Sequence, residues 1–250
     1  MNNNVSLNNL NIVTKYSHDH FLFEMDQIIL NHPGFMSNIE NFTLYFLNSD
    51  DFPNFLSLPS LLSSSIKHLD ISVDKDCLFA RRNLSDLIQS QSQLLSLSLG
   101  FITPNSSLLD TFKSCSNTLT SIKFIHCDFT NVQSPNGFKY LTQLKSLQFV
   151  HCQGIKIQCF QSLLDLPDPL QIKSLKVIGS ISGIDLLIQK IDSYLEYLEL
   201  GIRDITERRK ALQSVMNYCN QIKFLHLSYI YCSNIYQLYK IITYNNKHLK

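Results

Sequence analysis

The chain has 250 residues, of which 44% are hydrophobic and 16% are charged, and its formal net charge at pH 7 is +1. This apolar content excludes a disordered chain, and the near-neutral charge excludes a broad basic field, so we expect no nucleic-acid and no membrane partner. Only two residues are Ala, which disfavours an ordinary helical bundle. No apolar run approaches the roughly 20 residues of a membrane helix, and the polar N-terminus lacks an apolar signal core.

The N-terminal segment, residues 1–38, is predicted to form an irregular repeat or cap. It contains one copy, beginning at Leu7, of a short phrase: apolar, two variable residues, apolar, one variable residue, apolar. A helix is expected over about 18–31, and the breaker pair Pro33-Gly34 should follow its end.

The same phrase recurs eight times in the remainder of the chain. The copies begin 27, 28, 25, 25, 28, 23 and 27 residues apart, at Ile39, Ile66, Leu94, Leu119, Leu144, Ile172, Leu195 and Ile222. Leu249 lies a further 27 residues on, where a ninth unit would open and be cut off at the C-terminus. We therefore predict that residues 39–250 consist of eight clear units of about 26 residues each.

Each unit is expected to contain one strand and one helix. The end of the phrase alternates apolar and variable residues, which predicts a short strand with one buried face. Apolar residues recur at helical spacing between several phrases, in the groups Leu84–Leu87–Ile88, Leu109–Phe112–Cys115, Leu212–Val215–Met216–Cys219 and Leu238–Ile241–Ile242. Such units bury their apolar faces only by stacking. The sequence therefore predicts an α/β solenoid, a horseshoe with a concave parallel sheet and convex helices.

The phrase and its period resemble leucine-rich repeats, of the cysteine-containing type found in F-box proteins and ribonuclease-inhibitor-like solenoids. That type has Cys or Asn three residues after the last apolar strand residue, which Cys127 and Cys152 match here. Ile102 and Ile230 occupy the position in two other units. The resemblance covers about residues 39–250, and the Ser/Asn-rich, Ala-poor composition is similar to that of fungal F-box/leucine-rich-repeat sets.

The resemblance implies a protein–protein interaction module. Its most direct form is the substrate-recognition region of an F-box-type ubiquitin-ligase adaptor, with a Skp-type adaptor and a cullin as further partners if an F-box lies upstream. Residues 1–38 do not contain the helical module, opening with Leu-Pro, that an F-box requires. The alternative is a stand-alone leucine-rich-repeat scaffold or regulatory binding protein with no link to ubiquitin.

The variable residues of each phrase should point to the concave surface, because alternation places them opposite the core. In the middle units they form a Ser column beside a Lys/Gln/Lys column, whereas in the last two units they include adjacent aromatic residues. Exposed aromatic residues beside charges are typical anchors of protein interfaces. We predict a protein partner on this face, although a convex site stays open, at Tyr197, Glu199, Phe224, His226, Lys123, Gln148 and Lys176.

Two His-Cys doublets lie one repeat apart, at His126-Cys127 and His151-Cys152. Four nitrogen and sulfur ligands on adjacent strands would suit zinc if they converged. The resemblance implies, however, that the two Cys point inward and fill the Cys/Asn position of the repeat. Neighbouring residues of an extended chain point to opposite faces, so the two His should then point outward. No metal is therefore expected at the doublets. A second cluster, His18-Asp19-His20 with His32, is expected to be solvated.

Catalytic motifs find little support in the sequence. The run Gly179-Ser-Ile-Ser-Gly183 has Ile181 where a nucleophile elbow needs Ser, so we expect a loop there. A Walker loop, a paired zinc Cys motif and a dinucleotide fingerprint are all missing from the sequence. The chain is therefore not expected to be an enzyme or to bind a cofactor.

Cysteine usage favours a cytoplasmic or nuclear protein. The chain has seven Cys, an odd number, and no C-x-x-C pair, which favours free buried thiols over a disulfide framework. The short basic runs Arg81-Arg82 and Arg208-Arg209-Lys210 are expected to be solvated surface, with nuclear import or phosphate contact as the alternative.

Overall fold

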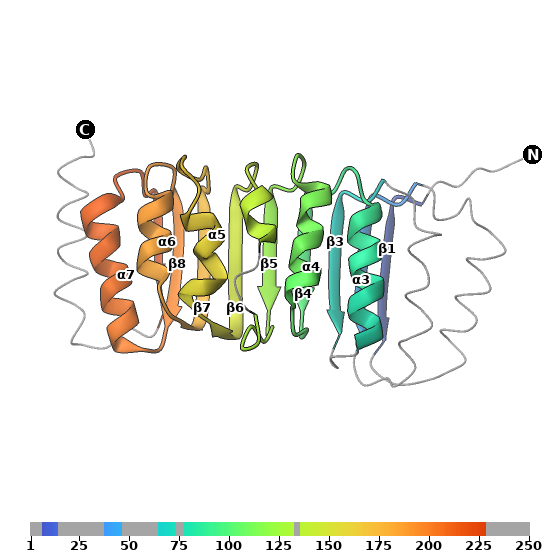
Figure 1. The fold of residues 1–250 in the computed structure, drawn as a ribbon, viewed down its shortest axis with the longest axis horizontal. Helices are drawn as coiled ribbons and strands as arrows, with labels where there is room; N and C mark the ends of the chain where they lie inside the picture. The colour runs from blue at the N-terminus through green and yellow to red at the C-terminus, as the bar shows by residue number, and fades with distance from the viewer. Residues whose placement is uncertain (1–6, 15–37, 47–64, 74–77, 133–135, 229–250) are drawn as a thin grey trace, which may run out of the picture.

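The computed structural model describes residues 7–14, 38–46, 65–73, 78–132 and 136–228. Nine strands within these ranges form one parallel sheet, in which they lie side by side in chain order (Figure 1). They are β1 (Asn9–Thr14), β2 (Asn41–Phe46), β3 (His68–Val73), β4 (Ser96–Gly100), β5 (Ser121–Ile125), β6 (Ser146–Ile155), β7 (Ser174–Ile181), β8 (Tyr197–Ile202) and β9 (Phe224–Leu227).

The strand register follows the repeat. Ser121 of β5 lies opposite Ser96 on one neighbour and Ser146 on the other, and equivalent phrase residues pair in this way along the sheet. The weak copy at the front obeys the same rule, since Leu10 of β1 pairs with Phe42 of β2. A one-residue slip would turn every apolar residue of a strand to the solvent, which explains why the phrase fixes the register.

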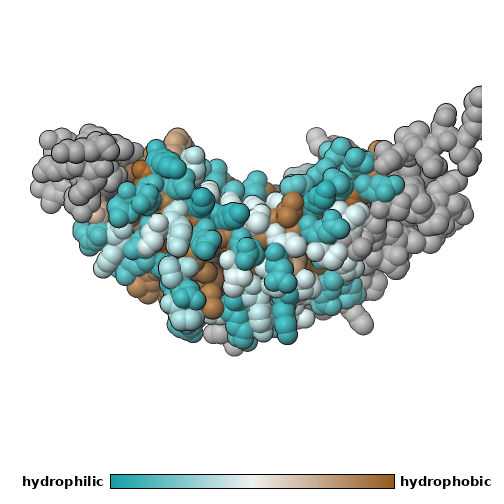
Figure 2. Space-filling view, turned by 90° about the horizontal axis from the view of Figure 1, so that it is seen from above, coloured by the Kyte–Doolittle hydropathy of each residue, from teal (hydrophilic) through white to brown (hydrophobic). Residues whose placement is uncertain are grey.

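Helical segments connect the strands across one face of the sheet (Figure 1). The α-helices described are α3 (Leu78–Ser90), α4 (Ser106–Asp110), α5 (Gln161–Leu164), α6 (Ile184–Ile191) and α7 (Ile205–Tyr218), and the 3₁₀ helices are η3 (Thr111–Cys115), η4 (Gly137–Tyr140) and η5 (Ile157–Phe160). The molecule is a crescent, with the helices on its outer side and the sheet lining the hollow (Figure 2). The predicted α/β solenoid with a concave parallel sheet is confirmed.

One continuous core lies between the sheet and the helices. The apolar residues of the phrase fill the core from the sheet side. Leu97 and Leu99 of β4, for example, are fully buried. The helices fill it from the other side, where α3 buries its predicted group Leu84, Leu87 and Ile88. On α7, three of the four predicted residues are buried and the fourth, Met216, is half-buried. The group at 238–242, the expected helix at 18–31 and Leu249 lie outside the described residues.

Two expectations for local structure need correction. The predicted helix through Leu109, Phe112 and Cys115 is divided into α4 and η3, because the Thr111 hydroxyl donates to the Leu108 carbonyl and competes with regular backbone pairing. The expected loop at 179–183 is mostly strand, since β7 continues to Ile181 and pairs with β6 and β8. The turn itself reduces to the two residues before α6, where Gly183 has a positive φ of 76°.

Candidate partner-binding surface

The concave face carries two columns of side chains that the sheet register aligns. The first column, from β1 to β9, contains Asn9, Asn41, His68, Ser96, Ser121, Ser146, Ser174, Tyr197 and Phe224. The second column contains Asn11, Thr43, Asp70, Ser98, Lys123, Gln148, Lys176, Glu199 and His226. The apolar residues between the columns face the core, so all seven predicted binding residues lie on one face.

Two aromatic rings are exposed at the C-terminal end of the first column. Tyr197 is 50% exposed and Phe224 is 54% exposed, and their ring centroids are 6.5 Å apart across β8 and β9. The inward positions of β8 are already occupied by Leu198 and Leu200, which are fully buried. The rings therefore leave apolar area in contact with water that a binding partner would cover.

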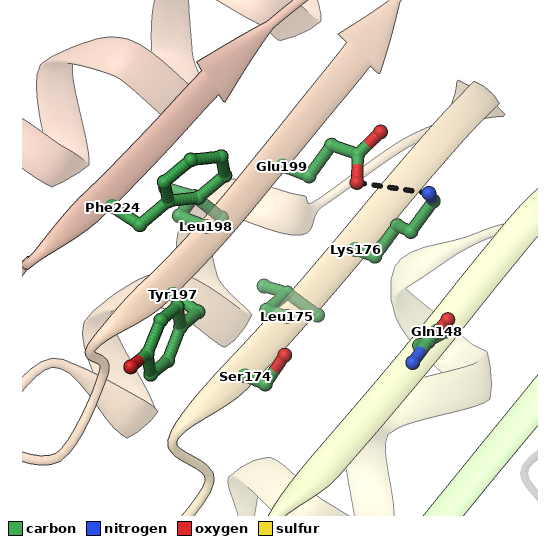
Figure 3. Close-up of a pocket in the computed structure, with 8 residues that line it drawn as sticks. All are labelled: Gln148, Ser174, Leu175, Lys176, Tyr197, Leu198, Glu199 and Phe224. Carbon is green, nitrogen blue, oxygen red and sulfur yellow. Dashed lines mark ion pairs between the residues drawn. The ribbon is translucent and has the colours of Figure 1, made fainter.

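A depression of about 310 Å³ lies beside these rings on strands β6 to β9 (Figure 3). Its lining residues are Gln148, Ser174, Leu175, Lys176, Tyr197, Leu198, Glu199 and Phe224. Five of the seven predicted residues are therefore brought together around one depression. The other two are set apart from it: His226 lies beyond Glu199 on β9, and Lys123 lies on β5.

Ionisable side chains link the last three strands across the floor of this surface. The Lys176 ammonium is 2.9 Å from Oε2 of Glu199, and Nδ1 of His226 is 3.4 Å from Oε1 of the same carboxylate. All three side chains are partly exposed, so such pairs add little to the free energy of unfolding. Their effect is to hold the Glu199 carboxylate next to the two rings.

A third row of charges, directly before six of the nine described strands, was missed by the sequence analysis. Glu196 lies between two lysines, 2.7 Å from Lys223 and 3.4 Å from Lys173. The hydrogen bond from Lys223 is the main reason why the pKa of the Glu196 carboxyl is lowered. The signal was present, because the first variable residue of the phrase is charged in the units of β2, β3 and β6 to β9, but only the second and third variable residues were assigned to the concave face.

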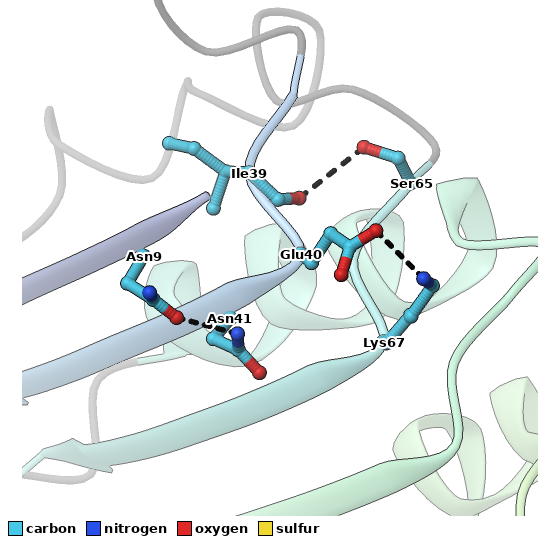
Figure 4. Close-up of polar contacts among 6 residues, drawn as sticks. All are labelled: Asn9, Ile39, Glu40, Asn41, Ser65 and Lys67. Carbon is cyan, nitrogen blue, oxygen red and sulfur yellow. Dashed lines mark hydrogen bonds and ion pairs between the residues drawn. The ribbon is translucent and has the colours of Figure 1, made fainter. Parts of the chain in front are cut away.

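The N-terminal strands present a different concave edge, on which Asn side chains begin both columns. Asn41 donates through Nδ2 to Oδ1 of Asn9, so the first column begins with paired amides (Figure 4). Beside this amide pair, the Lys67 ammonium is 2.6 Å from a carboxylate oxygen of Glu40 (Figure 4). The two charges that directly precede β2 and β3 therefore neutralise each other. These contacts satisfy the polar groups within the chain itself.

The His-Cys doublets divide between the two faces as expected. Cys127 and Cys152 are buried, and the Cys127 thiol donates to the Leu99 carbonyl at 3.2 Å. Burial raises the pKa of the Cys127 thiol. His126 and His151 are exposed, with ring centroids 5.1 Å apart, so the four side chains do not converge. Within the described ranges, no group of three or more His, Cys, Asp or Glu is placed to hold a metal ion.

The two His continue into an aromatic stack that sequence reasoning did not foresee. Phe101 stacks on His126 with a centroid distance of 4.8 Å, one strand before the His pair. All three residues have positive φ, between 52° and 57°, a conformation that side-chain-bearing residues rarely adopt. Period-2 alternation does not predict this stack, because the backbone leaves the extended conformation at these three residues.

The basic runs behave differently from the expectation of solvated surface. Arg208 is buried on α7, where its guanidinium donates to the Ile202 carbonyl at 3.3 Å, because it packs between the helix and the end of β8. Arg209 is exposed, and Lys210 pairs with Glu207 at 2.8 Å. Arg81-Arg82 lies in α3, but its side chains are outside the described residues, as are His18, Asp19, His20 and His32.

Within the ranges given above, no helix is both long and apolar enough to cross a bilayer.

No protein-family model and no curated protein sequence matches the chain. Among solved structures, internalin C2 of Listeria monocytogenes is 16% identical with a TM-score of 0.48, over 78% of this chain and 74% of the internalin. The internalin InlF of the same organism is 14% identical with a TM-score of 0.47, over 84% of this chain and 60% of its own.

Proposed function

We propose that this chain is a protein–protein interaction module that binds its partner on the concave face of strands β7 to β9. The observation that carries the proposal is the adjacent exposed pair, Tyr197 and Phe224, beside the depression. A few residues supply most of the binding free energy in protein interfaces, and tyrosine is enriched among them, while aromatic residues in general are enriched in interfaces. The Glu199 carboxylate, held by Lys176 and His226, gives the surface a polar rim that discriminates between partners.

The convex side offers a weaker case for the same role. Its large exposed apolar residues are separated: Ile205 and Tyr218 lie at opposite ends of α7, about 20 Å apart at 1.5 Å per residue. Single exposed apolar residues are normal on protein surfaces. The paired rings on the sheet therefore favour the concave face.

The test is affinity capture from the native cell extract, with quantitative mass spectrometry of the retained proteins. The double variant Tyr197→Ala/Phe224→Ala should lose its specific partner by at least about tenfold, as two aromatic anchors are removed. A matched control, Leu186→Ala/Tyr218→Ala, removes similar exposed apolar area from α6 and α7 and should retain the partner. Equal capture by both double variants, each folded by circular dichroism, would contradict the location.

A finer assignment within this function is substrate recognition for an F-box-type ubiquitin ligase. It is supported by the resemblance of the repeat to the cysteine-containing type and by the burial of Cys127 and Cys152 at the matching position. A substrate would then occupy the concave face, and a Skp-type adaptor and a cullin would join through an F-box encoded upstream.

Transcript mapping separates this assignment from the stand-alone alternative. A message that continues upstream into a helical module opening with Leu-Pro supports the ligase adaptor. A message that begins at Met1, together with no Skp-type adaptor in the capture experiment, favours a leucine-rich-repeat scaffold or regulator without ubiquitin chemistry.

The same proposal places the protein in the cytoplasm or nucleus. Five cysteines in the described ranges are free and buried, which suits a reducing compartment. A fluorescent fusion expressed in the native cell would locate it, and accumulation in the secretory pathway would contradict this placement.

A further inference from the structure

Four lysines lie on or directly before the concave strands β5 to β7. Lys123 and Lys176 belong to the second column, while Lys145 and Lys173 directly precede β6 and β7. The first-column residues between these two rows are Ser121, Ser146 and Ser174. Among the concave positions of these three strands there is no acidic residue in the described sheet. We call this group of four the lysine patch.

The positive charge of the patch is only partly neutralised by the chain. Lys123 and Lys145 have no ion-pair partner among the described residues. Lys173 and Lys176 are paired with Glu196 and Glu199, which come from β8 and the residue before it.

Both of those acids have a second basic partner outside the patch. Glu196 is closer to Lys223, at 2.7 Å, than to Lys173, at 3.4 Å. Glu199 is also in contact with His226 through its other oxygen. A ligand that recruited Lys173 or Lys176 would therefore not leave these carboxylates without a partner, which lowers the cost of binding.

The serine column lies between the two rows of lysines. Its hydroxyl groups can donate hydrogen bonds to carboxylate oxygens, and the lysines supply the compensating charge. Ser174 also lines the depression beside Tyr197, so the patch is continuous with the proposed docking surface. Acidic residues of the chain stand at both flanks, Asp70 on β3 and Glu199 on β8, which restricts an anionic ligand to the middle strands.

The spacing of the patch specifies the form of the ligand. Lys123 and Lys176 are two strands apart, which corresponds to about 10 Å at the usual strand separation. Three residues of a polyproline II segment cover about 9 Å and return the side chain to the same side. An extended segment that crosses the strands with an acidic residue at every third position would therefore meet both lysines.

We propose that the lysine patch binds an extended acidic segment of the partner, with Asp or Glu at every third residue. This rests on the proposed function, since the segment would enter the same concave surface whose aromatic end anchors the partner. The chemistry recognised is a row of carboxylates on a protein chain.

The experiment uses the full chain and a fluorescein-labelled peptide with Glu at every third position and Pro and Ala between. Fluorescence anisotropy should show binding that weakens as salt is raised, and a peptide with Gln in place of Glu should not bind. Lys123→Gln/Lys145→Gln should raise the Kd about tenfold. The matched control Lys113→Gln/Lys156→Gln removes the same charge from exposed positions off this face and should stay within about twofold.

Several results would overturn the proposal. These are equal loss in both double variants, binding of the Gln peptide, or tight binding of a single-stranded oligonucleotide that displaces the Glu peptide. The two proposals fail separately, because partner capture that depends on Tyr197 and Phe224 but not on Lys123 and Lys145 would remove the acidic segment and keep the docking surface.

Discussion

Aromatic rings occupy opposite sides of the sheet in the middle and last repeats. On β5 and β6, Phe124 and Phe149 point into the core and stack with a centroid distance of 5.4 Å, while serines face the hollow. On β8 and β9, Tyr197 and Phe224 point into the hollow, and the core is filled by aliphatic residues. Rings at the last apolar position of the phrase thus pack the core in one region, whereas rings at a variable position of the phrase are exposed in the other, where we propose that they bind a partner.

The helical layer explains why the middle repeats need rings inside. There the sheet is covered by short segments such as η4 and η5, whose Phe138 and Phe160 are fully buried. A short 3₁₀ segment presents fewer side chains to the sheet than a full α-helix does, so larger ones fill the space. The last repeats have the regular helices α6 and α7, whose Leu and Ile residues suffice.

Among the variants that test this comparison, the largest loss of stability is expected when a ring is removed from the core. Phe149→Ala removes a ring that stacks on Phe124 and contacts Phe129 and Phe160 edge-on, so it should lower the free energy of unfolding by about 3–5 kcal/mol. Phe224→Ala removes a half-exposed ring and should cost less than about 1 kcal/mol. Urea denaturation followed by circular dichroism measures both, and similar losses would contradict the division into packing and recognition rings.

A smaller effect concerns pH and the buried thiol behind the last repeats. Burial raises the pKa of Cys219 to about 12, from an ordinary value near 9. The unfolded thiol loses its proton above pH 9 while the folded thiol keeps it, so this contribution to stability is complete below pH 9 and is lost as the pH rises toward 12. Between pH 9 and pH 11, the free energy of unfolding of Cys219→Ala should therefore fall by about 1–2 kcal/mol less than that of the wild type.

Cys115 provides the comparison with the middle repeats. Its pKa is raised to about 11, again mainly by burial, so Cys115→Ala should reduce the alkaline loss by a smaller amount than Cys219→Ala. Denaturation at a series of pH values gives the slopes. Parallel curves for the wild type and both variants would show that neither thiol is shielded in the folded state.

The smallest expected effect is that of the charges beside the exposed rings. Glu199→Gln breaks the contacts with Lys176 and His226, yet it should change the free energy of unfolding by less than about 0.5 kcal/mol, because these side chains are partly exposed. A loss above about 2 kcal/mol in the same denaturation assay would mean that the charged network stabilises the sheet rather than serving recognition.

The sheet and the face that its variable residues occupy could be predicted from the sequence. A phrase with two apolar strand positions fixes register and inward direction together, which is why Tyr197 and Phe224 could be placed side by side before any coordinates were known. The inward position of Cys127 was implied by the resemblance to cysteine-containing repeats, and the outward position of His126 followed from its being the neighbour of Cys127.

Other features depend on contacts that alternation does not encode. The division between α4 and η3 involves a single side-chain hydrogen bond from Thr111, and the buried Arg208 depends on the packing of α7 against β8. The positive φ of Phe101 begins where the strand ends. Lys145 and Lys173 adjoin the concave surface because each directly precedes a strand, and they were missed because only the second and third variable residues of each phrase were assigned to that surface.

The most direct test of the concave docking surface is site-specific photo-crosslinking. A benzoylphenylalanine residue replacing Phe224 should crosslink a partner protein in the native cell, whereas the same residue replacing Tyr218, equally exposed on α7, should not. A crosslinked partner at position 224 that is absent at 218 is the predicted result. Crosslinking at 218 alone would place the binding surface on the convex helices and contradict the assignment of the outward rings to recognition.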